Sequence, residues 1–402
     1  QGQVGQIGSD DTRDTSNQAF GFSTIQLATK LLLGSALIVG TATAQEIAID
    51  PNQAGSKPII GVAANGVPVV NVVAPNAQGV SLNQFQNYNV NANGLVLNNS
   101  GAMSQTQLAG FIQGNPMLGN NAARTIINQV TGPNGSSLNG YQEIAGNRSN
   151  LIVANPNGIS VNGAGFINAA NVTLTTGTPQ FNNGALTGFN VTGGNITVNG
   201  QGLNATGADK LSLITRAAQL NAQVWANQAD LILGANQVTV DGNTNTAGIN
   251  AQTGQGTAPQ FALDVAALGG MYAGQMRLVG TEAGLGINNG GKLISEGNLT
   301  LDAQGNLTNA GRIESGNDSS ISVKDLTNSG QITTVNNQVI NAQAANNSGN
   351  LTAGSVQLNA TSLNNTGNIT QSGAQSFDIA ASSLVNTGRI GIVDQTASGG
   401  GS

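Results

Sequence analysis

Residues Leu151 to Gly165 read LIVANPNGISVNGAG, and this stretch decides the fold that we predict for the chain. It opens with a short apolar run rich in β-branched residues, which is typical of a buried strand. Asn-Pro-Asn-Gly follows at residues 155–158, where proline fixes φ, asparagine bonds to its own backbone and glycine accepts a positive φ. Apolar alternation resumes at Ile159 and Val161. The stretch therefore predicts a strand, a tight turn and a second strand.

The composition extends this pattern to the whole chain. Of the 402 residues, 7% are charged and 57 are glycine, whereas a globular enzyme carries about 25% charged residues. A hydrophobic fraction of 39% with little charge also differs from a disordered chain. Small β-forming residues separated by turn residues over hundreds of positions favour a stacked β-solenoid.

Charge and residue types exclude several classes of function. The chain has 12 Lys plus Arg and a net charge of −6, so no basic surface is expected and nucleic-acid binding is disfavoured. It contains no Cys and no His, which removes thiol nucleophiles, the usual zinc ligands and His-dependent triads. We therefore expect no cofactor, no metal site and no catalytic residues.

After residue 289 the chain becomes openly repetitive. An Asn-x-Gly triplet returns about every 20 residues, which is the length of one solenoid rung. The stacked asparagines should form a ladder of amide hydrogen bonds along the axis. Beyond a first triplet at Asn289, the repeat-turn pairs are Asn309 and Gly311, Asn328 and Gly330, Asn347 and Gly349, Asn365 and Gly367, and Asn386 and Gly388.

These patterns predict an all-β fold, a parallel β-helix with an N-terminal cap. About 17 rungs of about 20 residues each would give a rod about 80 Å long. The residues near Glu46 to Ile60 should cap the first rung, because an open sheet edge needs a cover. Before them, Lys30 precedes the apolar run Leu31 to Val39 and small residues up to Ala44, so residues 1–44 have the shape of a signal peptide. Residues 398–402 are interpreted as a linker or truncation tail.

Several motifs occur in a fixed order along the chain: GNPMLGN from Gly114, ARTIINQVTG, LNGYQEIAG, the NPNGI run, GFINAANVTLTTG and ALGGMYAGQMRLVGTEAGLGINN, which ends at Asn289. In this order they resemble the secretion domain of two-partner secretion exoproteins, the family of filamentous haemagglutinins, contact-dependent inhibition toxins and high-molecular-weight adhesins. The resemblance places a secretion domain at residues 45–290 and haemagglutinin-like repeats at residues 291–397.

The resemblance implies a right-handed parallel β-helix that a dedicated outer-membrane transporter with POTRA domains recognises in the periplasm. The family's two transporter-recognition motifs map onto Asn115, Pro116 and Leu118, and onto Asn155, Pro156, Asn157, Gly158 and Ile159. Met117 departs from the asparagine of the first motif. The implied product is a secreted or surface-exposed exoprotein of a Gram-negative bacterium, whose receptor contacts lie outside this fragment.

Two other classes of function stay open at this stage. Parallel β-helices also house carbohydrate-active enzymes, which need converging carboxylates, and Asp302 and Asp325 lie close to one rung apart. We interpret these two as solvated turn residues. The Asn-rich repeats could also form a self-associating fibre. The lone Trp225, like Phe85 and Tyr88, is interpreted as a packing residue.

Overall fold

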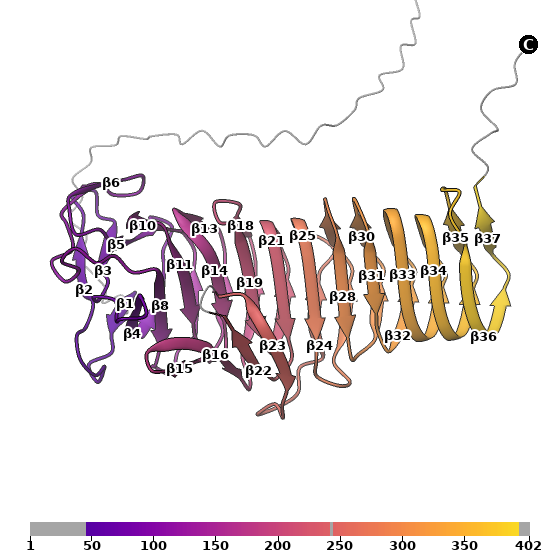
Figure 1. Cartoon of the computed structure of the whole chain (residues 1–402), viewed down its shortest axis with the longest axis horizontal. Helices are drawn as coiled ribbons and strands as arrows, with labels where there is room; N and C mark the ends of the chain where they lie inside the picture. The colour runs from indigo at the N-terminus through magenta and orange to yellow at the C-terminus, as the bar shows by residue number, and fades with distance from the viewer. Residues whose placement is uncertain (1–45, 242–243, 394–402) are drawn as a thin grey trace, which may run out of the picture. The chain divides into compact units, whose positions relative to one another are not determined.

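The computed structural model describes residues 46–241 and 244–393, which lie in one compact unit, Ala44–Ser402. The expected leader, 1–44, and the expected tail, 398–402, fall outside the described residues. Every regular element in the described ranges is a β-strand, and the strands wind into a parallel β-solenoid of about 13 turns (Figure 1). The predicted all-β parallel β-helix is confirmed. No helix of the described part is long and apolar enough to cross a membrane.

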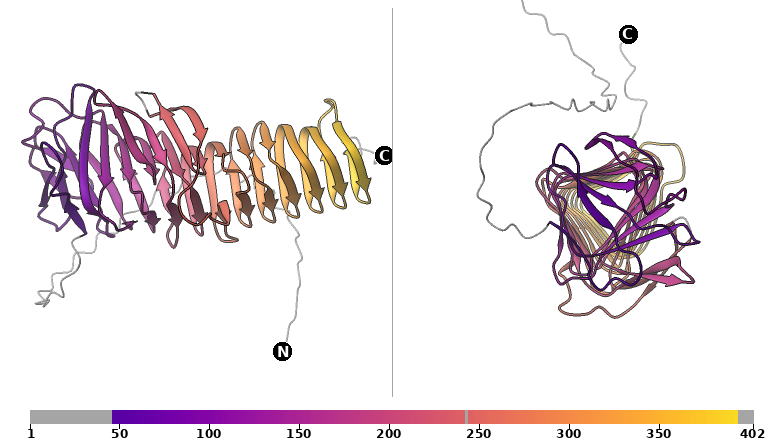
Figure 2. Two further views of the ribbon diagram at one scale, coloured as in Figure 1. Left: turned by 90° about the horizontal axis from the view of Figure 1, so that it is seen from below. Right: turned by 90° about the vertical axis from the view of Figure 1, so that its left-hand side faces the viewer.

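Each turn contributes strands to three parallel faces, which enclose the interior when the solenoid is viewed from its end (Figure 2). Face 1 consists, in order of pairing, of β3 (Pro68–Asn71), β5 (Leu95–Asn99), β10 (Tyr141–Gly146), β13 (Ala164–Ile167), β18 (Leu203–Ala205), β21 (Gln223–Leu233), β25 (Gly270–Gly280), β27 (Lys292–Ser295), β30 (Arg312–Ser315), β33 (Gln331–Asn347), β34 (Asn350–Asn365), β35 (Asn368–Gln371) and β37 (Arg389–Ile392).

The other two faces continue the same coils, because the longest strands bend around the corners. Face 2 contains β4 (Val80–Tyr88), β8 (Thr125–Val130), β11 (Ser149–Ala154), β14 (Ala169–Thr175), β19 (Lys210–Thr215), β28 (Leu299–Ala303), β31 (Ser319–Ser322) and parts of β21, β25, β33, β34 and β36 (Asp378–Asn386). Face 3 contains β9 (Ser136–Leu138), β12 (Ile159–Val161), β17 (Asn195–Val198), β20 (Ala217–Leu220), β24 (Phe261–Val265), β26 (Gly286–Asn289), β29 (Leu307–Asn309), β32 (Asp325–Asn328) and the ends of β33, β34 and β36.

Antiparallel strands cover the N-terminal end of the solenoid. β1 (Ile47–Ile49) pairs with β4, and β2 (Ile59–Val62) pairs with β3, both antiparallel. Phe85 and Tyr88 are fully buried in β4, and their ring centroids lie 5.1 Å apart. The first strands of faces 1 and 2 are thereby paired, so they offer no open edge to another chain.

Two further antiparallel sheets lie outside the coils. β6 (Ser104–Thr106) and β7 (Gly110–Ile112) form a hairpin. β15 (Thr178–Asn182), β16 (Ala185–Val191), β22 (Asn236–Val240) and β23 (Thr246–Ala251) form a four-stranded sheet. Phe189, Val191 and Val238 of this sheet pack on Ile152 and Ile214, which point outward from face 2. The main core lies inside the coils and runs from Ile47 to Ile369.

The number of rungs corrects the sequence estimate. About 13 turns of about 21 residues occur where about 17 were expected, and their stacking gives a rod about 60 Å long. The estimate assigned every residue from 45 to 395 to a rung. Caps, hairpins and the four-stranded sheet use up residues without adding a turn. Trp225 also differs from expectation, because it is 36% exposed and stacks on Tyr272 of the next coil with centroids 4.2 Å apart.

Candidate functional site

The NPNGI turn closes the corner between β11 on face 2 and β12 on face 3. The Asn155 side chain is fully buried. Its Oδ1 accepts the Asn157 backbone N–H at 2.9 Å, which forms the turn, and its Nδ2 donates to Asn134 O at 3.0 Å and Ser136 Oγ at 2.9 Å. Gly158 has φ +110°, a conformation that favours glycine. Asn155 therefore joins two coils while it shapes its own turn.

A second Pro-Asn-Gly turn lies on the preceding coil, and sequence reasoning missed it. Ser136 pairs with Ile159 in the β9–β12 register, so residues 133–135 lie one coil away from residues 156–158. Asn157 Nδ2 donates to Gly132 O at 2.8 Å across the two turns. The shared triplet, 23 residues apart in the printed sequence, could have revealed this stacking.

The Asn-Pro turn at Asn115 repeats the geometry of the NPNGI turn. Asn115 is 1% exposed. Its Oδ1 accepts the Met117 N–H at 2.9 Å, and its Nδ2 donates to Val72 O at 2.8 Å and Asn98 O at 2.9 Å. Leu118 is buried in the main core. The Met117 contact uses the backbone alone, so the turn forms without the asparagine side chain expected there.

The two turns lie at different corners of the solenoid. Asn115 bonds to carbonyls at the ends of face 1 strands, whereas the Asn155 N–H donates to Thr175 O at the end of β14 on face 2. The structure therefore does not bring the two motifs into one cleft. Both asparagines are buried, while Pro116, Pro156 and Asn157 are exposed.

The repeat-turn asparagines form a continuous ladder at the corner that ends face 3, and its members from Asn289 to Asn365 are buried. Nδ2 of each residue donates to Oδ1 of the next, from Asn289 through Asn309, Asn328, Asn347 and Asn365 to Asn386, at 2.7 to 2.8 Å. The ladder begins at Asn289 because Val265 holds the paired position on the preceding coil. Asn289 Oδ1 accordingly has no hydrogen-bond partner in the described part of the chain.

The glycine of each triplet is required by close backbone contact. A Cβ on Gly349 would lie 2.1 Å from Gly330 O, and one on Gly311 would lie 2.0 Å from Gly291 O. The same clash, at 2.1 to 2.2 Å, recurs at Gly330, Gly367 and Gly388. Any side chain at this column would therefore push adjacent coils apart.

The two carboxylates considered for catalysis, Asp302 and Asp325, lie on different faces, and two other carboxylates, Asp230 and Glu282, are held in ion pairs. Asp302 pairs with Ser322 on face 2, whereas Asp325 lies on face 3 and accepts the Ala344 N–H at 3.2 Å. Arg216 donates to both carboxylate oxygens of Glu282, at 3.0 and 2.7 Å, and this hydrogen bonding holds the pKa of Glu282 below its usual value. Asp230 is paired with Arg277 at 2.8 Å.

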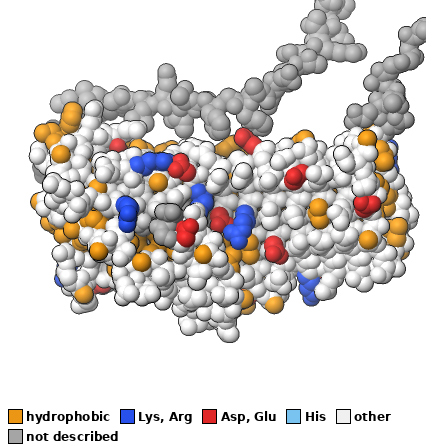
Figure 3. Space-filling view, viewed as in Figure 1, with side chains coloured by type: hydrophobic (Ala, Val, Ile, Leu, Met, Phe, Trp, Pro, Cys, Tyr) orange, Lys and Arg blue, Asp and Glu red, His pale blue; other side chains and the backbone are white. Residues whose placement is uncertain are grey.

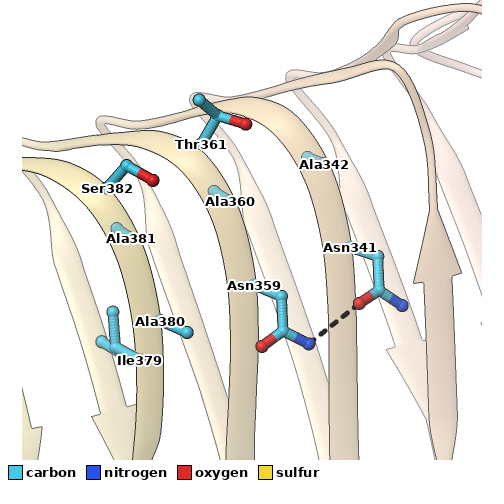
Figure 4. A pocket seen from close by; sticks show the side chains of 9 residues that line it. All are labelled: Asn341, Ala342, Asn359, Ala360, Thr361, Ile379, Ala380, Ala381 and Ser382. Carbon is cyan, nitrogen blue, oxygen red and sulfur yellow. Dashed lines mark hydrogen bonds between the residues drawn. The ribbon is translucent and has the colours of Figure 1, made fainter.

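A shallow surface depression on the last coils has no chemically active side chain in its lining (Figure 4). Asn341 and Asn359 face each other across neighbouring coils, and Asn359 Nδ2 donates to Asn341 Oδ1 at 2.9 Å. Small residues such as Ala360 and Ala381 complete the lining. Within residues 46–241 and 244–393, no group of acidic, His or Cys residues could hold a metal ion.

Comparison with protein families matches residues 45–315 to the TPS secretion domain. The chain belongs to this two-partner secretion family. The chain is 42% identical over 298 residues to a protein named Toxin CdiA from Yersinia pestis, covering 74% of this chain and 9% of that protein. It is 48% identical over 257 residues to the 16S rRNA endonuclease CdiA of Enterobacter cloacae, covering 63% of this chain and 8% of that protein. The matched part of the chain thus spans under a tenth of the length of these relatives.

A solved structure supports the same assignment. The crystal structure of the filamentous hemagglutinin secretion domain matches 86% of this chain and 100% of that chain, with a TM-score of 0.58 and 27% identity. TPS exoproteins pass through the periplasm to the surface of a Gram-negative cell or into the medium, and the family assignment gives this TPS domain the same destination.

Proposed function

We propose that this TPS domain targets a large exoprotein, an adhesin of the haemagglutinin type or a contact-dependent inhibition toxin, to a cognate outer-membrane transporter with POTRA domains. The domain also forms the first part of the shaft of that exoprotein. The family match and the CdiA relatives support this proposal. The observation that carries it is the pair of Asn-Pro turns with one shared geometry, both within the matched residues.

The recognition residues in this proposal are Asn115, Pro116, Leu118, Asn155, Pro156, Asn157, Gly158 and Ile159. Asn115, Leu118, Asn155, Gly158 and Ile159 are buried in the folded coils, so a partner reaches these side chains only before folding. Folding then withdraws them into the solenoid. The folded domain leaves Pro116, Pro156 and Asn157 available at the surface.

Progressive folding supplies the driving force for export. Each coil that emerges from the transporter docks on the previous one and buries apolar residues, as Ile313 and Ile332 do on adjacent strands β30 and β33. Such burial releases about 25 cal/mol per Å² of apolar surface. Contacts of this kind link neighbouring coils only, so the solenoid grows rung by rung without nucleotide hydrolysis.

Export from cells that co-express the chain and its transporter tests the proposal. Asn115→Ala and Asn155→Ala are compared with Asn347→Ala, which also removes a buried asparagine that joins coils but lies outside both motifs. We expect export to require the transporter and to fall strongly in the two motif variants. The Asn347 variant should retain most export, although its fold is weakened.

Two results would contradict the proposal. Export without the transporter would remove the targeting role. An equal loss of export in all three variants would show that export depends on the stability of the fold and not on the two recognition motifs. The enzyme and fibre alternatives have weaker support, because the family match favours a secretion domain, and Asp302 and Asp325 lie on different faces of the solenoid. Receptor contacts are assigned to parts of the exoprotein outside this chain, and no nucleic-acid partner is proposed.

A further inference from the structure

The turn between β22 and β23 contacts the start of β19 on face 2 through a lysine. Lys210, the first residue of β19, donates from Nζ to Asn245 Oδ1 at 2.8 Å. A second contact of Nζ, with Thr244 O, is longer at 3.5 Å. Charged side chains of both signs gather over these middle coils in the space-filling view (Figure 3). An amine and an amide from positions 35 residues apart therefore lie in direct contact.

The same amide also contacts a carboxylate. Asn245 Nδ2 donates to Asp241 Oδ2 at 3.3 Å, and the Asn245 backbone N–H donates to Asp241 Oδ1 at 2.9 Å. The Asp241 N–H in turn donates to Asn245 O at 2.9 Å. The amide is thus held on both sides, with the lysine at its oxygen and the carboxylate at its nitrogen.

Burial changes the acidity of the Lys210 amine. It lowers the pKa of Lys210 below the usual value, whereas the Asp230 and Asp241 carboxylates oppose this shift and the Arg277 guanidinium adds to it. Asp230 has its own partners, because it accepts from Arg277 Nη1 at 2.8 Å and from Thr246 Oγ1 at 3.2 Å. A lower pKa increases the fraction of uncharged amine, which is the nucleophilic form of lysine.

We propose that Lys210 and Asn245 react in the folded domain to form an isopeptide bond. Lys210 Nζ bonds to Asn245 Cγ, the Cγ–Nδ2 bond breaks, and Nδ2 leaves as ammonia. Asp241 takes one proton from the lysine ammonium group before the attack and gives it to the departing ammonia. The products are a secondary amide and an ammonium ion, so atoms and charge balance without an oxidant or a cofactor.

The contact geometry supports this reaction. Asn245 Cγ is bonded to Oδ1, the atom that Lys210 Nζ already touches, so the two reacting atoms are close neighbours. Holding two groups in this way converts a bimolecular step into a unimolecular one and removes much of its barrier. A positioned carboxylate that moves the proton contributes a further factor of about 10² to 10⁴. Because the groups meet only in the folded sheet, an unfolded chain is not cross-linked.

The bond fixes the four-stranded sheet to the coils. It joins the β22–β23 turn of that sheet to β19, and a cross-link of this kind stabilises a fold mainly by restricting the unfolded chain. The chain has no Cys, so a disulfide cannot provide the same restraint. The isopeptide bond gives a cysteine-free chain a covalent brace.

Mass spectrometry of the purified, folded full chain tests the bond. The reaction lowers the intact mass by that of one ammonia, but a succinimide at an Asn-Gly pair gives the same loss, so the denatured chain is also digested with trypsin. In the cross-linked chain trypsin cannot cut after Lys210, and residues 149–216 stay attached to residues 217–277. In the open chain residues 211–216 are released as a separate peptide.

Three variants and a matched control separate the roles of the groups. Lys210→Arg and Asn245→Ser each remove one reacting group and should abolish the cross-link. Asp241→Asn keeps the size of the side chain without the proton acceptor, so the cross-link should form at least about a hundredfold more slowly. Lys57→Arg changes a lysine whose Nζ donates to a backbone carbonyl, Pro51 O, at 2.5 Å. This control should cross-link as the parent chain does.

The parent chain decides the main point, whatever the variants do to folding. Full mass and cleavage after Lys210, in protein whose β-structure is confirmed by circular dichroism after days at neutral pH, would overturn the proposal. A loss of ammonia with cleavage after Lys210 would also overturn it, since the ammonia then came from another asparagine. Cross-linking at the parent rate in Asp241→Asn would overturn the proton transfer assigned to Asp241.

Discussion

Removing one amide from the middle of the asparagine ladder should destabilise the solenoid measurably. Asn347 is 4% exposed. Its Nδ2 donates to Asn365 Oδ1 at 2.7 Å and Asn368 O at 3.1 Å, and its Oδ1 accepts from Asn328 Nδ2 at 2.7 Å. Asn347→Ala removes all of these hydrogen bonds and leaves buried partners unpaired.

The size of the effect follows from these contacts. A neutral hydrogen bond contributes about 1 kcal/mol, and an orphaned buried group adds about 1 to 3 kcal/mol. Asn328 Nδ2 keeps a second acceptor, Asn350 O at 3.2 Å, which limits the damage on that side. We expect the free energy of unfolding to fall by about 3 kcal/mol. Asn346→Ala, on an exposed neighbour, should change it by less than about 0.5 kcal/mol.

Guanidinium unfolding followed by far-ultraviolet circular dichroism measures both variants. The midpoint and the slope are both needed, because a weakened coil in the middle of a solenoid can split the transition. Asn386→Ala extends the series. Within the described residues this exposed side chain has one ladder contact, accepting from Asn365 Nδ2 at 2.8 Å, so its loss should cost less than Asn347→Ala. A loss at Asn347 no larger than that at Asn346 would refute the ladder as a source of stability.

Three further expectations concern other parts of the chain. Gly349→Ala should destabilise by more than about 1 kcal/mol through its backbone clash, whereas Gly391→Ala, with open space around it, should be nearly neutral in the same unfolding assay. The pKa of Glu282 is lower in the folded state than its usual value of 4.5. The contribution of Glu282 to the free energy of unfolding is therefore complete above pH 4.5 and is lost as pH falls through the folded-state pKa. Glu282→Gln should remove this contribution to the pH dependence of the free energy of unfolding. Tyr272→Ala should shift the emission of Trp225, the one tryptophan of the chain, to longer wavelength without loss of β-structure, and an unchanged spectrum would contradict the stacking.

The coils after residue 289 were predictable because each of their rungs repeats the same local chemistry. Asn-x-Gly marks the corner, and Ile313, Ile332 and Leu351 follow it at the same place in successive coils. The turn at residues 155–158 could be predicted equally well, since proline fixes φ and glycine accepts a positive φ whatever surrounds them. These features depend on residues close in sequence, so sequence alone could locate them.

The excursions were not predictable from the same patterns. β16 and β22 alternate apolar and polar residues as coil strands do, and only the antiparallel pairing at Phe189 and Val238 separates them from the solenoid. The exposure of Trp225 depends on which side of β21 faces outward, which one residue of register decides. The burial of Asn155 and the contact between Lys210 and Asn245 depend on partners far away in the sequence.

The side-chain amides of the asparagine ladder donate in one direction along the solenoid, so each coil presents a donor to which the following coil must align. Every amide N–H points toward the coil that follows, so an arriving segment must bring an oxygen to one fixed place. A segment that slips by one residue brings a neighbour of the asparagine instead, turns its apolar set to the wrong side and leaves a buried donor unsatisfied. A coil that docks out of register is therefore less stable than a correctly aligned one, so the ladder favours one alignment of each coil on its neighbour.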